Sequence, residues 1–130
     1  MSSSDETKEL LEQILSQLYQ KQARKHVLEE KSYLIAQDNQ FLGKITSDPY
    51  DRNSVLNEYG PYGSEYSPTS IFNEYSQYGS EYGAYSINNP YCSSPPKLFI
   101  QGRFLGRVSV NQYITNRIPT GSFLYTLKNN

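Results

Sequence analysis

The chain has 130 residues, which is enough for one domain of ordinary size and too few for two independent cores. Only 36% of the residues are hydrophobic, and 13 tyrosines with no tryptophan supply much of the apolar surface, so we expect a thin core with many turns. The formal net charge is −1, and the single cysteine, Cys92, excludes an intrachain disulfide and an all-cysteine metal site.

The sequence also argues against a membrane or secreted setting. No stretch approaches the roughly 20 apolar residues that a spanning helix needs. The polar, acidic start lacks the basic and apolar regions of a secretory signal. We therefore expect a cytoplasmic protein with no membrane partner.

The first predicted element is an amphipathic helix over about residues 5–30. Ser3 and Glu6 have the spacing of a capping box, in which both side chains satisfy free amides of the first turn. Apolar residues then recur at spacings of three and four, which places them on one face. A long coiled coil is not supported, because the next heptad positions fall at Lys21 and Lys25.

This face must be buried against something, and two alternatives carry equal weight. One is packing of the helix on its own domain. The other is oligomerisation or docking of a protein partner, predicted for Leu11, Ile14, Leu15 and Leu18.

Two β-hairpins with similar sequences are predicted, at residues 33–45 and 98–108. The segments 41–50 and 104–113 both begin with Phe-Leu-Gly and both end with tyrosine. Agreement over this length indicates duplicated units of one sheet. Gly43 and Gly106 occupy matched positions and predict a bulge or a close backbone approach.

A tyrosine-rich repeat of 16 residues lies between the hairpins. Residues 54–69 align without gaps on residues 70–85, and a truncated third copy begins at Ser86. Gly, Pro, Ser and Asn fill much of each unit, so we expect turns rather than long strands. The few aliphatic residues that we expect to point inward include Val55, Ile71 and Ile87.

The tyrosines of the repeat are predicted to form a face that contacts a partner. Its members are Tyr59, Tyr62, Tyr66, Tyr75, Tyr78 and Tyr82. Alternatively, the rings pack on one another and on the sheet, or the segment stays disordered until it binds.

The pattern from Phe41 to Tyr113 resembles a set of uncharacterised bacterial proteins. The resemblance rests on a Phe-Leu-Gly strand, on Ser-Ile-x-Asn-x-Tyr-Gly-x-Tyr-Gly-Ser-x-Tyr-Ser units, and on Asn-Pro-Tyr and Pro-Pro before a closing hairpin. It implies a bacterial origin and a genuine domain. It implies no activity and no site residue.

No catalytic constellation is visible, so we predict that the protein is not an enzyme and carries no cofactor. The one histidine, His26, lies in a polar helical stretch, and Cys92 has no local partner. The serines lack a Gly-x-Ser-x-Gly context, and the glycines form no phosphate loop. The glutamates at equivalent repeat positions lack the spacing of a calcium loop, so we expect solvated carboxylates: Glu58, Glu65, Glu74 and Glu81.

Charge is distributed unevenly along the chain. Residues 46–96 contain six acidic residues and one basic residue, whereas residues 97–130 contain five basic residues and no acidic one. Packing within the chain, head-to-tail association of copies, or an anionic ligand would each explain this asymmetry. Contact with an anion is predicted for Arg103, Arg107 and Arg117.

The sequence therefore predicts an α+β protein with an N-terminal amphipathic helix at residues 1–31 and a tyrosine-rich domain at residues 32–130. In that domain, two related hairpins form a small antiparallel sheet wrapped by the turn-rich repeat. The favoured function is a non-enzymatic protein-interaction or self-assembly module. The alternative is a module that binds a glycan or single-stranded nucleic acid, with nucleic acid the less favoured partner.

Overall fold

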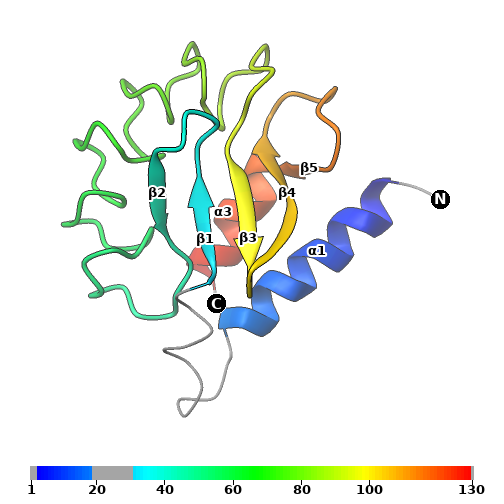
Figure 1. Ribbon diagram of the computed structural model, residues 1–130, viewed down its shortest axis with the longest axis horizontal. Coiled ribbons are helices and arrows are strands. Elements are labelled where there is room, and N and C mark those ends of the chain that lie inside the picture. Colours follow the sequence, from blue (N-terminus) through cyan, green and yellow to red (C-terminus); the bar gives the residue numbers. More distant parts are fainter. Residues whose placement is uncertain (1–2, 19–30, 130) are drawn as a thin grey trace.

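The computed structural model describes residues 3–18 and 31–129, and Figure 1 shows their arrangement. Within these described ranges, two helices and one sheet confirm the expected α+β class. The helices are α1 (Ser3–Leu18) and α3 (Thr120–Lys128), and the strands are β1 (Tyr33–Ile35), β2 (Phe41–Lys44), β3 (Lys97–Ile100), β4 (Arg103–Ser109) and β5 (Arg117–Pro119).

The sheet is mixed and has five strands in the order β2-β1-β3-β4-β5. The first four pair antiparallel, and β5 pairs parallel with β4. The predicted antiparallel sheet of two hairpins is therefore incomplete. It lacks the parallel strand β5, and helix α3 was not predicted either. Strand β5 has only three residues and ends in Pro119, which is too short for a detectable alternation of apolar and polar residues. Helix α3 buries few apolar side chains in its nine residues, so its helical periodicity is weak.

The two hairpins share an irregularity at equivalent positions. Leu34 pairs with Gly43 while Ile35 pairs with Phe41, so the register passes over Leu42, and the β3–β4 register passes over Leu105 in the same way. Gly43, next after the bulge, has a φ of 130°. A Cβ atom at Gly106 would lie 2.3 Å from the Asn116 carbonyl oxygen, so only glycine fits there.

Helix α1 belongs to the same core as the sheet. It contacts α3, β5 and β3, and Figure 1 shows it beside the β3–β4 hairpin. Ile14 is fully buried in the core cluster, with Leu10 and Leu11 packed against it. The docking face predicted for this helix is therefore covered by its own domain at Leu11 and Ile14, while the side chains of Leu15 and Leu18 and the predicted continuation over residues 19–30 lie outside the described residues.

Residues 45–96 connect β2 to β3 as a chain of turns. In Figure 1 this segment, coloured from teal through green to yellow, forms outward loops around the β2 edge and across one end of the sheet. Within the described part of the chain, no helix is long and apolar enough to cross a membrane.

The burial of Ile14 leads to a stability prediction. Replacing it with alanine (Ile14→Ala) leaves a cavity, so we expect the free energy of unfolding to fall by about 2–5 kcal/mol in urea denaturation. The exposed neighbour Glu12 is the matched control, and Glu12→Ala should change stability little. A change in molecular mass without loss of stability would instead identify Ile14 as an oligomer contact.

Candidate functional site

The connecting segment is a ribbon of overlapping β-turns. From Asp48 to Gly83, backbone amides donate to the carbonyl oxygen three residues earlier at 3.0–3.4 Å, except for a four-residue step from Gly60 to Ser64 and an added four-residue bond from Ser80 to Ser76. The residue that starts a turn in this way is here called a step residue. In chain order the step residues are Asp48, Asp51, Ser54, Asn57, Gly60, Ser64, Ser67, Ser70, Asn73, Ser76 and Ser80.

Side chains of the step residues close the turns a second time. The Asp48 and Asn57 carboxyl or amide oxygens and the Ser64 hydroxyl each accept from the backbone amide two residues later, at 2.9–3.1 Å. The same bond recurs at most other steps, and such Asx and ST turns replace the bonds that a strand would make with a neighbour. The ribbon thereby satisfies much of its own backbone.

Three asparagines spaced 16 residues apart clamp the ribbon to itself. The Asn73 side-chain oxygen accepts from the Tyr75 amide at 2.9 Å, and its nitrogen donates to the Ser67 carbonyl at 2.9 Å. Asn57 and Asn89 make the equivalent pairs of bonds. Asparagine suits these positions because its side chain offers an acceptor and a donor together.

Aliphatic residues with the same spacing anchor the ribbon to the core. Val55, Ile71 and Ile87 are almost completely buried, each directly after a fully buried serine. Each 16-residue unit consists of four steps of three residues and one step of four residues, so the same kind of side chain returns to the core once per unit. That step contains Gly63 in one unit and Gly79 in the next, where a Cβ atom would lie only 2.2 and 2.4 Å from the Asn57 and Asn73 carbonyl oxygens.

The most exposed tyrosines all occupy the same place in a turn, two residues after a step residue or its counterpart. Each follows Glu, Pro or Gln, and their side chains are 84–94% exposed. We call this set the tyrosine row: Tyr50, Tyr59, Tyr66, Tyr75, Tyr82, Tyr91 and Tyr113. The triplet of Asp, Asn or Ser, then Glu, Pro or Gln, then Tyr occurs at every member of the row. It also occurs at Ser76-Gln77-Tyr78, whose tyrosine is buried, so the triplet alone does not separate exposed from buried rings.

Two of the six tyrosines predicted for the contact face do not belong to it. Tyr62 packs edge-on against Phe41, with ring centroids 5.0 Å apart. Tyr78 is buried, and its hydroxyl donates to the Asp38 carboxylate at 2.8 Å. Each lies in the turn after an exposed tyrosine, and there the side chain contacts the first hairpin instead of solvent.

The repeat builds two equivalent clefts between exposed tyrosines. Cleft A, of about 650 Å³, is flanked by Glu58, Tyr59, Glu65 and Tyr66, with Gly63 between them. Cleft B, of about 670 Å³, has the residues 16 positions later in the same places: Glu74, Tyr75, Glu81, Tyr82 and Gly79. Cleft A also includes Phe72 and Lys128, whereas cleft B has Asn88 in place of Phe72.

In each cleft one tyrosine hydroxyl is hydrogen-bonded to the carboxylate of the preceding glutamate. A hydrogen bond to the Glu65 carboxylate, and then the negative charge of that group, raise the pKa of the Tyr66 hydroxyl. Glu81 raises the pKa of Tyr82 by the same causes. The hydroxyls of Tyr66 and Tyr82 therefore keep their protons to a higher pH than a free tyrosine does.

A second surface lies on the sheet face away from α1. Tyr33 stacks on Phe99 with centroids 5.1 Å apart, Phe41 lies 6.2 Å from Tyr33, and Phe104 lies 5.7 Å from Phe99. Alternation along β3 and β4 puts Lys97 and Arg107 on this face, while Leu98 is buried beneath the sheet. We call these residues the outer sheet face.

Of the three predicted anion contacts, Arg107 and Arg117 are register partners on β4 and β5, whereas Arg103 lies at the other end of β4. Arg107 donates to the Gln37 side-chain oxygen at 2.9 Å and to the Pro95 carbonyl at 3.2 Å, and Arg117 donates to the Ser109 carbonyl at 3.0 Å. Arg103 is exposed at the start of β4. Two of the three guanidinium groups therefore already bind the protein's own backbone.

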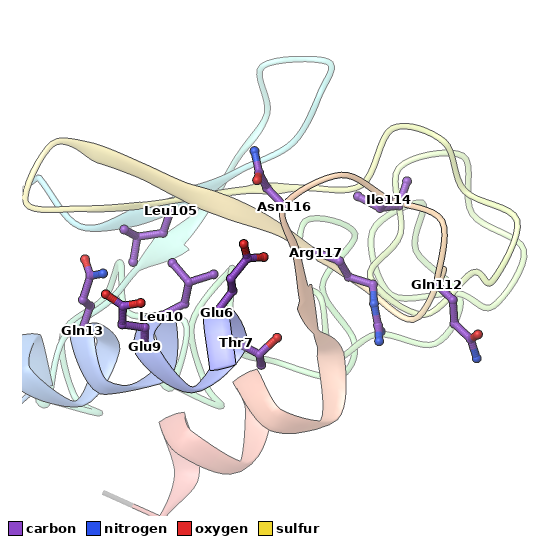
Figure 2. Close-up of a pocket in the computed structure, with 10 residues that line it drawn as sticks. All are labelled: Glu6, Thr7, Glu9, Leu10, Gln13, Leu105, Gln112, Ile114, Asn116 and Arg117. Carbon is purple, nitrogen blue, oxygen red and sulfur yellow. The ribbon is translucent and has the colours of Figure 1, made fainter. Parts of the chain in front are cut away.

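A third cleft, of about 530 Å³, separates α1 from β4 and β5. Figure 2 shows Leu10 and Leu105 facing one another at its centre, while Glu6 points toward Asn116 and the Arg117 side chain points away from the helix. Its charged groups do not converge, so this cleft offers no evident reactive centre.

The remaining chemistry-bearing residue is Cys92. Burial raises the pKa of its thiol, and its Sγ donates to the Ala84 carbonyl at 3.1 Å. The described residues contain no group of three or more His, Cys, Asp or Glu side chains placed to hold a metal ion, and His26 lies outside them.

Comparison with protein-family models, curated proteins and solved structures found no match.

The buried Tyr78 hydroxyl predicts an alkaline transition. Burial, and then the bond to Asp38, raise the pKa of Tyr78 from 10.0 to about 12. Because the folded pKa is the higher one, this stabilisation is complete below pH 10 and is lost as the pH rises toward 12. In Tyr78→Phe, we expect unfolding to be easier at pH 7 by about 1 kcal/mol and less pH-dependent above pH 10.

The measurement for Tyr78 is urea denaturation at a series of pH values, followed by circular dichroism. Tyr125→Phe, on the exposed surface of α3, is the control and should retain the pH dependence of the original chain. An identical alkaline slope in Tyr78→Phe would contradict the role given to this hydroxyl.

Proposed function

We propose that the chain is a non-enzymatic protein-interaction module whose contact surface is the tyrosine row. The observation that carries the proposal is the placement of seven tyrosines at one turn position, each with more than four fifths of its surface exposed. Large exposed aromatic side chains gathered on one surface are typical of interaction sites. Tyrosine combines a large apolar area with a hydroxyl that tolerates water before binding.

The turns reduce the cost of using these rings. Each tyrosine amide is held by a step residue, for example Tyr75 by Asn73 and Tyr82 by Ser80. A backbone that is ordered before binding loses less conformational entropy when a partner arrives. The proposed contact surface is therefore the ribbon and not the face of α1, where Ile14 is buried.

Self-assembly remains within this proposal because the two surfaces differ in charge. The clefts of the ribbon carry glutamates, while the outer sheet face carries Lys97 and Arg107, with Arg103 exposed nearby. Contact between unlike surfaces of two copies would be head-to-tail. In this proposal the two related hairpins, wrapped by the repeat, form the scaffold that supports both surfaces. The proposed cellular setting is the cytoplasm, where the free thiol of Cys92 stays reduced.

A second function, binding of single-stranded nucleic acid or a glycan, is favoured by one observation. Aromatic rings on four strands of the outer sheet face lie next to basic side chains, an arrangement that suits stacking on bases or sugars. Phe104, 43% exposed, and Arg103 are the residues on which such binding would depend. The engaged guanidinium groups of Arg107 and Arg117 make this the weaker proposal.

The interaction proposal predicts the effect of removing four rings together. A random peptide library is selected on the full chain, and the affinity of each selected peptide is then measured for a variant with Tyr59, Tyr66, Tyr75 and Tyr82 changed to serine. We expect binding to weaken about tenfold or more, because exposed aromatic anchors carry much of the energy of such contacts. Folding should persist, since these side chains are largely in solvent.

Tyr125→Ser is the matched control, because this tyrosine is exposed on α3 and lies outside the row. Peptides that bind the fourfold variant as tightly as the original chain would contradict the proposal. If binding is lost only in Phe104→Ala, and single-stranded oligonucleotides compete for it, the outer sheet face is the functional surface.

A further inference from the structure

We propose that clefts A and B bind the positively charged side chains of a partner polypeptide, so that the tyrosine row recognises arginine or lysine residues. This inference rests on the proposed interaction function and specifies its chemistry. It depends on the two glutamates and two tyrosines that the repeat places around each cleft, and not on the number of tyrosines alone.

The equivalence of the two clefts is the first argument. Two glutamates and two tyrosines surround each cleft at positions one repeat apart, and the glycine between them is required by the fold of the ribbon. The four glutamates are exposed. Solubility alone would not require each carboxylate to stand next to an exposed ring.

The combination of groups determines which ligand fits. A cation gains from the negative face of an aromatic ring and from a carboxylate, and both are present on two sides of each cleft. In cleft B, where no basic residue is among the described lining residues, an anionic ligand would be repelled by the two carboxylates. Arginine is especially suitable because its planar guanidinium stacks on a ring while bonding a carboxylate.

The chain itself places a cation at one cleft. Lys128 lines cleft A, and its ammonium nitrogen lies 4.6 Å from the centroid of the Phe72 ring. Cleft B contains Asn88 at the position of Phe72, and no basic residue is among the described residues that line it. Cleft B is therefore open to a cation from a partner, while Lys128 competes for cleft A.

The direct test uses synthetic peptides and the full-length chain. Fluorescence anisotropy measures binding of an arginine-rich peptide, a glutamate-rich peptide of equal length and a neutral Gly-Ser peptide. We expect binding of the arginine-rich peptide alone, weakened by added salt. In Glu74→Gln/Glu81→Gln, which removes charge from cleft B without changing side-chain size, the affinity should fall about threefold to tenfold, as for one or two exposed ion pairs.

Three matched variants make the test specific. Glu12→Gln removes one exposed charge from α1 and should leave binding unchanged. Glu58→Gln/Glu65→Gln should have a smaller effect than the cleft B variant, because Lys128 already offsets part of the negative charge of cleft A. Adding Lys128→Met to the cleft B variant should restore part of the affinity by freeing cleft A.

The outcomes separate this inference from the broader proposal. If the neutral or glutamate-rich peptide binds equally well, or if both glutamine variants bind like the original chain, cation recognition is wrong. Selected peptides that still depend on the four tyrosines would then leave the interaction function standing. Loss of dependence on the tyrosines as well would remove both.

Discussion

The structure depends on a polar side chain at nearly every third residue of a segment that has few strand partners. Between β2 and β3, Asp, Asn and Ser side chains bond the amide two residues ahead, and backbone amides bond the carbonyl three residues behind. This double closure replaces most of the hydrogen bonding of a sheet. These bonds involve the backbone amide of the residue two positions after the step residue and not its side chain. A tyrosine at that position can therefore expose its ring to solvent while its backbone stays ordered.

The sequence predicted the features that have a 16-residue spacing better than those that have a three-residue spacing. The inward orientation of Val55, Ile71 and Ile87 follows from aliphatic residues being rare in a polar repeat, and they are buried. Sorting the tyrosines required the local turn geometry, so Tyr62 and Tyr78 were wrongly grouped with the exposed ones. Helix α3 gave too weak a pattern in nine residues, and burial of Ile14 depends on tertiary contacts that periodicity cannot distinguish from an oligomer interface.

The ribbon and the sheet divide the molecular surface by charge. Acidic residues of the repeat stand beside exposed rings in clefts A and B, while Lys97 and Arg107 share the outer sheet face with Tyr33, Phe99 and Phe104. Asp51 is drawn into the fold by an ion pair with Lys44 at 2.7 Å. The glutamates of the clefts remain exposed, and the proposed recognition of a cationic partner relies on them.

Amide hydrogen exchange of residues 48–92, resolved by NMR, tests the turn ribbon most directly. The account predicts a three-residue pattern: at the Asn73 turn, the amides of Tyr75 and Ser76 donate hydrogen bonds and exchange slowly, while the exposed amide of Glu74 exchanges quickly. The pattern should shift by one residue after the Gly60–Ser64 step. Uniformly fast exchange over this segment, with slow exchange confined to the strands, would contradict an ordered ribbon.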